Sequence, residues 1–261
     1  QENGSGSSNK IYTEEVKVTG ERYTSKDFME KELSKLWSKV WNIGGWSREL
    51  ENQGDFVIHH IGRESILMVK EKNNTVKAYH NVCPHRGNRL VHIDSGHVKE
   101  FTCTYHGWKF NYSGDLIYAQ DEEDFPQGNP CGKVKLSEIP CEEYAGFIWY
   151  NMDKNCFPLK GFLGEVTKYI DMFDNDGLKR VYHKVCEVPF NWKALRDNFC
   201  ESYHLPSTHP QINDYYDDDY KNTDFELYET GHNLMKMKGS LPSLRNTELF
   251  KVNEKLEAEL I

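Results

Sequence analysis

The sequence predicts an α+β protein, with an antiparallel β domain followed by the beginning of a second domain in which helices pack on a sheet. Two observations support this fold class. Between residues 46 and 152, short apolar segments alternate with turns rich in Gly, Asn and Ser, which is typical of antiparallel strands. Before and after this stretch, apolar residues recur at helical spacing. We therefore divide the chain into residues 1–45, 46–152 and 153–261.

The N-terminal part is predicted to be an arm followed by one helix. Residues 1–8 are rich in Gly and Ser and carry no initial Met, so they are left out of the fold. A helix is expected over residues 25–41, with Thr24 or Ser25 as its N-cap. Its apolar stripe is expected to pack in the core rather than to contact a partner. The stripe consists of Phe28, Met29, Leu33, Leu36, Trp37 and Val40.

The middle part is predicted to be a small β domain that carries two loops near its tip. Strands are expected over residues 55–61, 65–70, 75–81 and 146–150, the last of them a buried closing strand. Turns are expected at Asn73 and Asn74, at Ser95 and Gly96, and at Ser113 and Gly114. The two loops cover residues 83–88 and 103–109.

The third part is predicted to mix helices with a strand. A helix is expected near residues 164–173, and residues 179–188 alternate like a strand that ends at Pro189. A second helix is expected over residues 191–204. Further along, the sequence predicts an exposed acidic loop at residues 214–219 and a charged helix at residues 248–260.

Composition argues against two classes of partner. The chain has 32 Lys and Arg against 41 Asp and Glu, and this net charge of −9 disfavours nucleic acid. No apolar run approaches the roughly 20 residues that span a bilayer, and no signal peptide is recognisable. We therefore expect a cytoplasmic protein without a membrane partner. Five scattered cysteines are expected to be reduced thiols, namely Cys131, Cys141, Cys156, Cys186 and Cys200.

The two loops each carry one cysteine and one histidine, Cys83 with His85 and Cys103 with His106. A zinc finger, the main alternative, usually places both Cys in one knuckle and both His in the other. The flanking sequences C-P-H-R-G and C-T-Y-H-G-W closely resemble the cluster-binding loops of Rieske proteins. The resemblance implies a 2Fe–2S cluster in which the two Cys hold one iron and the two His hold the other.

A second constellation lies in the segment N-F-C-E-S-Y-H-L-P-S-T-H, residues 198–209. A helix ending near His204 would place Glu201 one turn earlier on the same face. Pro206 is expected to break the helix and to fold His209 back toward His204. Two His and a carboxylate are typical of a non-haem iron(II) site. Taken alone, two His at this spacing are more often structural.

Together the two motifs, with N-W-K at residues 191–193, closely resemble the Rieske non-haem iron oxygenases, the catalytic α-subunit family of ring-hydroxylating dioxygenases and related monooxygenases. The resemblance covers about residues 55–210. It implies that His204 and His209 bind a mononuclear Fe(II). It also implies that Glu201 bridges an iron-ligand His to His106 of the partner subunit in a trimer.

The resemblance also implies the partners of the reaction. Electrons are expected from NAD(P)H through a separate reductase or ferredoxin, because the chain has no Gly-rich nucleotide loop. The co-substrates are expected to be O₂ and a small organic, aromatic molecule. Glu rather than Asp at position 201 favours relatives that attack quaternary ammonium compounds. Ordinary packing is favoured over an aromatic cage for such a cation at the residues Tyr215, Tyr216, Tyr220, Phe225 and Tyr228.

One expected element is missing from the sequence. In the family, the third iron ligand is an aspartate far beyond the second histidine, and no carboxylate of this chain stands there. We expect either that the sequence is a part of a longer oxygenase, which we favour, or that the iron site is incomplete. The carboxylates nearest to His209 in the sequence are Asp214, Asp217, Asp218 and Asp219.

Two other functions remain as alternatives, a pure electron carrier and a catalytically inactive scaffold. A respiratory Rieske protein carries an additional Cys in each loop, where this chain has Asn88 and Tyr105. A Rieske ferredoxin would end soon after Tyr150, whereas this chain continues through His204 and His209. A catalytically inactive scaffold is the remaining alternative if the mononuclear iron site stays incomplete.

Overall fold

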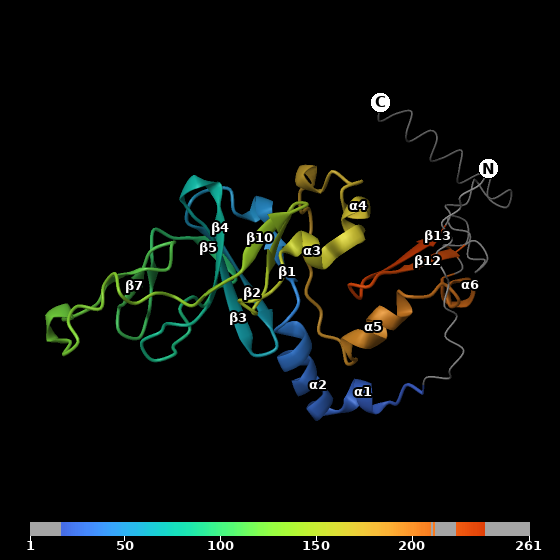
Figure 1. Ribbon diagram of the computed structural model, residues 1–261, viewed down its shortest axis with the longest axis horizontal. Coiled ribbons are helices and arrows are strands. Elements are labelled where there is room, and N and C mark those ends of the chain that lie inside the picture. Colours follow the sequence, from blue (N-terminus) through green and yellow to red (C-terminus); the bar gives the residue numbers. More distant parts are fainter. Residues whose placement is uncertain (1–16, 210, 212–222, 238–261) are drawn as a thin grey trace.

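The computed structural model describes residues 17–209, 211 and 223–237. In this part of the chain, a β-rich body occupies one end of the molecule and a region of short helices with one hairpin occupies the other, with the short N-terminal helices beside both (Figure 1). The fold class is therefore the predicted mixture of helices and antiparallel sheets. The expected acidic loop at 214–219 and the expected helix at 248–260 lie outside the described residues.

The N-terminal segment is helical, but it ends earlier than predicted. Ser25 caps α2 as expected, since its hydroxyl accepts a hydrogen bond from the Phe28 amide at 3.3 Å. The π-helix η1 ends at Trp37 rather than at residue 41, where the Asn42 side-chain amide donates to the Trp37 carbonyl at 3.0 Å. The segment contains α1 (Glu21–Thr24), α2 (Lys26–Glu32) and η1 (Leu33–Trp37).

The apolar stripe of this segment is mostly half-buried rather than enclosed in a core. The buried side chain of α2 is the charged Glu32, while Met29 is 44% exposed. Leu33 and Trp37 are only partly buried, because they line a groove of about 310 Å³ against Ile61 of the β domain.

The β domain contains three antiparallel sheets. The first has the order β5-β2-β3-β4-β9 and contains β2 (Asp55–Ile61), β3 (Glu64–Lys70), β4 (Val76–His80), β5 (Ser95–His97) and β9 (Glu138–Ile139). The second has the order β1-β11-β10 and contains β1 (Asn42–Trp46), β10 (Cys141–Tyr144) and β11 (Phe147–Tyr150). The third contains β6 (Phe101–Thr102), β7 (Lys109–Phe110) and β8 (Leu116–Tyr118).

Four predicted strands are confirmed, and one predicted turn is wrong. The strands at 55–61, 65–70, 75–81 and 146–150 appear as β2, β3, β4 and β11. Asn73 and Asn74 form the expected turn, since both have positive φ. Gly96, however, lies in β5 and pairs with Phe56. A Cβ at Gly96 would lie 3.2 Å from the Phe56 ring, so glycine here allows close packing rather than a turn.

The core of the β domain reaches directly beneath the two cysteine loops. Phe101 and Phe110, from β6 and β7, are 1% and 0% exposed and belong to the same apolar cluster as Cys83 and Cys103. Tyr79 closes this core, and its hydroxyl donates to the Tyr112 carbonyl at 2.9 Å. The loops therefore rest on a packed interior that limits their movement.

The region after residue 152 consists of short elements. Helical structure is present near residues 164–173 as predicted, but it begins earlier and breaks at Gly164, which has a φ of 57°. The helices are α3 (Leu159–Leu163), η5 (Gly164–Val166), α4 (Thr167–Ile170), η6 (Asn175–Gly177), α5 (Trp192–Asn198) and α6 (Leu205–Thr208). The hairpin is formed by β12 (Thr223–Leu227) and β13 (Asn233–Met237). Elsewhere the chain forms 3₁₀ turns η2 (Ser47–Glu49), η3 (Lys72–Asn74) and η4 (Glu122–Asp124).

The strand predicted at residues 179–188 is wrong. These residues form no ladder with any described strand, and Val181 and Val185 are 94% and 80% exposed. Alternation alone cannot make a strand, because a strand is stabilised by hydrogen bonds and side chains across a partner. Separately, no helix among the described residues is long and apolar enough to cross a membrane.

Candidate iron–sulfur and iron sites

The two cysteine loops of the β domain have the same backbone design. In each loop the cysteine amide donates to the carbonyl five residues later, and the glycine four residues later donates back to the cysteine carbonyl. The four bonds are Cys83 N to Asn88 O at 2.8 Å, Gly87 N to Cys83 O at 3.0 Å, Cys103 N to Trp108 O at 2.8 Å and Gly107 N to Cys103 O at 2.9 Å.

Gly87 and Gly107 make these turns possible. Their φ values are 74° and 70°, a region that side chains rarely adopt. A Cβ at either glycine would meet no atom within 4 Å, so the requirement is one of backbone conformation rather than space. Each loop thereby turns its cysteine inward and its histidine toward the other loop.

The two thiols lie together at the bottom of the site. Cys83 and Cys103 are 1% and 2% exposed and share a hydrogen bond. Burial, followed by this hydrogen bond, raises the pKa of Cys83 to about 11, although the His85 and Arg86 amides oppose the rise. These amides point at the sulfur, which is the arrangement that stabilises a metal-bound thiolate.

The pKa of Cys103 shifts in the opposite direction to that of Cys83. Burial raises the pKa of its thiol, but hydrogen bonds from the Tyr105 and His106 amides, from Cys83 and from Asn88 outweigh it, and the pKa falls below its ordinary value. The Asn88 amide nitrogen lies 3.7 Å from the Cys103 sulfur. Sequence reasoning used Asn88 only to exclude the respiratory class, so its contact with the thiol was missed.

The two histidines form the outer half of the site. Their ring centroids are 4.6 Å apart, and the His85 ring stacks on Trp108 at 4.5 Å with an interplanar angle of 5°. The ring centroids of Tyr105 and His106 lie 3.9 Å apart. Burial, then His106 and Arg86, lower the pKa of His85, so its imidazole is neutral near pH 7, as metal binding requires.

One atom of this site has the environment of a metal-binding nitrogen. His85 Nδ1 is buried and has no hydrogen-bond partner, a state that is costly for a polar atom. Bonding to a metal would remove that cost. Among the described residues, no three His, Cys, Asp or Glu side chains converge as ligands of one ion. Two thiols and two imidazoles, with one of each in each loop, fit the ligand set of a cluster that divides its ligands between two irons.

The second histidine pair is organised by the single helical turn α6. His204 is the N-cap of α6 and His209 is its C-cap, and the two ring centroids are 5.5 Å apart at 76°. The predicted approach of the two rings is therefore present, but the predicted cause is wrong. Pro206 does not end a helix; it lies in the first turn of α6, where a missing amide hydrogen costs nothing.

Glu201 contacts His204 as predicted, although it does not lie on a helix. Helix α5 ends at Asn198, and Glu201 lies in the segment between α5 and α6. Its carboxylate accepts the His204 amide at 3.2 Å and pairs with His204 Nδ1. Partial burial raises the pKa of Glu201, but the hydrogen bonds from His204 and from the Tyr203 amide outweigh it and lower the pKa overall. This pairing orients the ring and leaves Nε2 available for a metal.

The structure does not bring the two sites together within one chain. Helix α6 and strand β7, which follows the second cysteine loop, lie at opposite ends of the molecule along its longest axis (Figure 1). A third protein ligand is also not assembled at His204 and His209 among the described residues. Asp214 and Asp217 to Asp219, considered from the sequence, lie outside the described residues.

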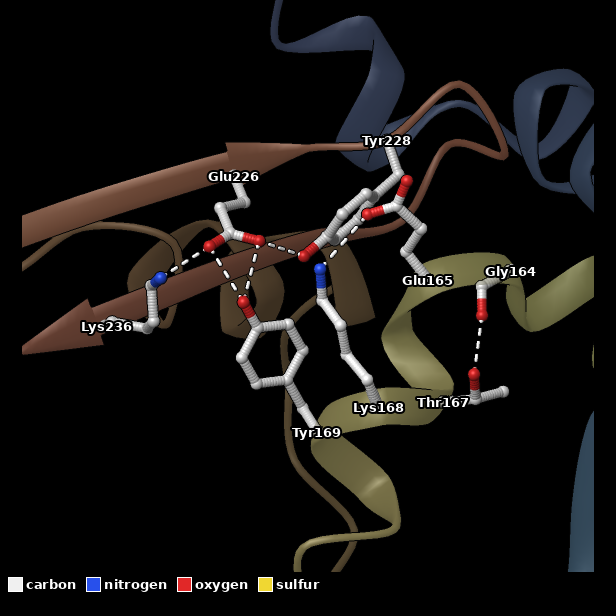
Figure 2. Close-up of polar contacts among 8 residues, drawn as sticks. All are labelled: Gly164, Glu165, Thr167, Lys168, Tyr169, Glu226, Tyr228 and Lys236. Atoms are coloured by element: carbon white, nitrogen blue, oxygen red, sulfur yellow. Dashed lines mark hydrogen bonds and ion pairs between the residues drawn. The ribbon is translucent and has the colours of Figure 1, made fainter. Parts of the chain in front are cut away.

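A polar cluster on the β12–β13 hairpin was not found from the sequence. The Glu226 carboxylate accepts hydrogen bonds from Tyr169 of α4 at 2.8 and 3.0 Å, from Tyr228 and from Lys236 (Figure 2). Glu226 lies in β12 and Tyr228 directly follows the strand, and their spacing of two residues in the sequence was the available signal. Tyr228 was a candidate for the aromatic cage but is engaged here, while Tyr215, Tyr216 and Tyr220 lie outside the described residues.

Comparison with known proteins agrees with this geometry. Residues 40–134 match the Rieske [2Fe-2S] domain, and residues 175–257 match the catalytic domain of ring-hydroxylating α subunits. The oxygenase subunit of carnitine monooxygenase from Escherichia coli K12 is 34% identical over 194 residues, covering 74% of this chain and 52% of that protein. The α subunit of biphenyl 2,3-dioxygenase from Rhodococcus jostii is 31% identical, covering 71% and 42%.

Solved structures give the same result. A quaternary ammonium Rieske monooxygenase bound to an inhibitor superposes with a TM-score of 0.75 and 28% identity, over 83% of this chain and 60% of that one. Naphthalene 1,2-dioxygenase with bound indole gives a TM-score of 0.63 and 30% identity, over 71% and 43%. The chain spans about half the length of the curated relatives it matches.

A Rieske domain joined in one chain to the histidine segment of a ring-hydroxylating catalytic domain defines the class of Rieske-type oxygenase subunits. Within this class, the chain belongs to the family of ring-hydroxylating α subunits, which includes both aromatic dioxygenases and carnitine monooxygenase oxygenase subunits.

Proposed function

We propose that the chain is the Rieske domain and the first part of the catalytic domain of an oxygenase that hydroxylates a small organic or aromatic substrate with O₂. The observation that carries this proposal is the presence, in one chain, of a two-Cys, two-His pocket with an unpartnered His85 Nδ1 and of a His204–His209 pair oriented by a carboxylate. We also infer the division into residues 1–45, 46–152 and 153–261.

In this proposal the residues have separate roles. Cys83 and Cys103 hold one iron of a 2Fe–2S cluster, and His85 and His106 hold the other. His204 and His209 hold a mononuclear Fe(II), with Glu201 fixing the His204 ring. When bound, the cluster supplies single electrons and the mononuclear iron supplies a site for O₂. Trp108 shields one face of His85 from solvent.

The placement of the sites supports electron transfer between subunits. His106 is half-buried beside the exposed Tyr105, so an electron leaves the cluster by the His106 edge. In the molecule, α6 lies far from β7, which follows the second cysteine loop (Figure 1). We therefore infer that His106 faces Glu201 of the partner subunit in a ring, with a trimer as the expected state. Electrons would come from NAD(P)H through a reductase or ferredoxin, in the cytoplasm.

A quaternary ammonium compound is the second candidate substrate. Glu at position 201 favours it, as do relatives described as carnitine monooxygenase oxygenase subunits. Product analysis with L-carnitine and with naphthalene would separate the two candidates. A pure electron carrier is disfavoured because it would need neither the His204–His209 pair nor its carboxylate.

The direct test is iron and acid-labile sulfide per chain, with an EPR spectrum of the dithionite-reduced protein. Three irons and two sulfides per chain would show that both sites fill, whereas two irons and two sulfides would show that the cluster forms without the mononuclear iron and would point to the absent third ligand. His106→Ala should lose the Rieske signal and its visible absorption, whereas Glu201→Gln should keep both metals and stop turnover. An unchanged spectrum in His106→Ala would remove the ligand assignment, and normal turnover in Glu201→Gln would remove the relay role.

A further inference from the structure

The three residues of the N-W-K motif, which the iron sites leave unexplained, all contact the N-terminal segment. The Asn191 side-chain amide donates to the Tyr23 carbonyl at 3.2 Å, while its oxygen caps α5 by accepting from the Lys193 amide. Trp192 packs edge-on against Trp37 with ring centroids 5.0 Å apart. The motif therefore joins α5 to residues that are far away in the sequence.

Lys193 makes the strongest of these contacts. Its ammonium lies 2.8 and 3.0 Å from the two oxygens of Glu32, and the two side chains are only 14% and 10% exposed. The same ammonium lies 5.7, 5.2 and 5.3 Å from the ring centroids of Tyr23, Phe28 and Trp192. A paired and caged ammonium is a strong anchor, because loss of one partner leaves a buried charge uncompensated.

Apart from the contact between Trp192 and Trp37, helix α5 makes little apolar contact. It contains no buried residue, and Leu195 is 51% exposed. Its remaining long-range side-chain contact among the described residues is the hydrogen bond from Tyr23 to Asp197 at 2.5 Å. The position of α5 therefore depends on the N-terminal segment, and Figure 1 shows the two lying side by side.

The N-terminal segment is in turn attached to the β domain. Glu30 of α2 pairs with Arg63 in the β2–β3 turn, and Leu33 and Trp37 line the groove against Ile61. Trp41, which follows the segment, is buried and donates to the Phe157 carbonyl at 2.8 Å. One side of the segment thus contacts the β domain, and the other side holds α5.

We propose that Lys193 is a positioning residue: its caged ion pair with Glu32 fixes α5 against the N-terminal segment and so sets the location of the Glu201–His204 pair. Glu201 follows the end of α5 at Asn198 by three positions, so a displaced helix displaces the carboxylate. The expected effect on Fe(II) binding rests on the proposed function above, whereas the attachment of α5 to the N-terminal segment does not.

The test compares three variants of the full chain with the cluster loaded. Lys193→Met keeps the aliphatic stem and removes the charge, and Lys193→Arg restores the charge. Lys168→Met is the matched control, because its ion pair with Glu165 is exposed and spans only three residues. Amide hydrogen exchange of residues 192–204 and titration with Fe(II) are the readouts, and the reduced EPR signal monitors the Rieske domain.

In Lys193→Met we expect exchange in α5 to accelerate about tenfold or more and Fe(II) to bind about tenfold more weakly, with an unchanged EPR signal. Lys193→Arg should recover most of the protection from exchange and most of the Fe(II) affinity. Lys168→Met should match the wild type in both measurements. Unchanged exchange in Lys193→Met would overturn the proposal. A wild type that loads the cluster but binds no Fe(II) would instead point to the absent third iron ligand, while exchange would still decide the attachment.

If Lys193→Met does not fold, Tyr23→Phe provides a milder version of the same test. It removes only the hydroxyl that donates to Asp197 and leaves the cage ring in place. Faster exchange confined to α5 and the following turn is the expected result, and exchange equal to the wild type would count against the proposal.

Discussion

The β domain and the region after residue 152 hold similar metal-binding side chains by different physical means. In the β domain, the cysteine loops rest on side chains such as Phe110, which is 0% exposed. After residue 152, His204 and His209 flank a single helical turn, and nearby Phe199 is 69% exposed. One site is positioned by apolar packing, and the other by short-range turns and polar contacts.

The difference between packed and polar support predicts how each region responds to a substitution. Removing volume from a buried core destabilises the whole domain, since the core atoms are close-packed. A helix held by an ion pair and hydrogen bonds loses its position when a single charge is removed, and its own stability changes little. The two regions should therefore respond differently to the same substitution.

The largest expected difference comes from truncating one phenylalanine in each region. Phe110→Ala should lower the free energy of unfolding by about 3–5 kcal/mol, because the ring lies in a closed core. Phe199→Ala should change it by no more than about 0.5 kcal/mol. Urea unfolding followed by tryptophan fluorescence measures both. Equal losses in the two variants would show that Phe199 is also packed in solution.

Glycines at turns should show a smaller contrast. Gly114 and Gly231 have φ values of 80° and 86°, so alanine costs about 1–2 kcal/mol at either position. At Gly114 the new Cβ would lie 2.7 Å from the buried Tyr79 ring, which adds about 1–3 kcal/mol, whereas no atom lies within 4 Å at Gly231. Thermal unfolding should therefore rank Gly114→Ala below Gly231→Ala, and the reverse order would contradict the packing described here.

The smallest expected effect is one of pH on the hairpin. Hydrogen bonds from Lys236, then Tyr228 and Tyr169, lower the pKa of Glu226 from 4.5 to about 2. The unfolded chain therefore binds the proton at higher pH, so the contribution to stability is complete above about 4.5 and is lost as the pH falls toward 2. A carbon NMR titration of the Glu226 carboxyl checks this, and a midpoint near 4.5 would indicate an unpaired carboxylate.

Local sequence was sufficient where the relevant neighbours are a few bonds away. The turn at Asn73 and Asn74 and the contact between Glu201 and His204 were predicted and are present, while the four cluster ligands stay a prediction. Each depends on spacing along the chain. The absence of a strand at 179–188 was not foreseeable in this way, because only the tertiary structure shows that the alternating segment has no partner strand among the described residues.

By itself, the sequence determined the identity of the ligand candidates, the main strands of the β domain and the family, since residue type and spacing are local properties. Tertiary structure alone decided that His85 Nδ1 is buried without a partner and that Glu32 pairs with Lys193 across 161 positions. It also decided that the two sites face opposite ends of the molecule (Figure 1). Burial and long-range ion pairs arise only when distant segments meet, because they depend on the surrounding atoms rather than on neighbours in the chain.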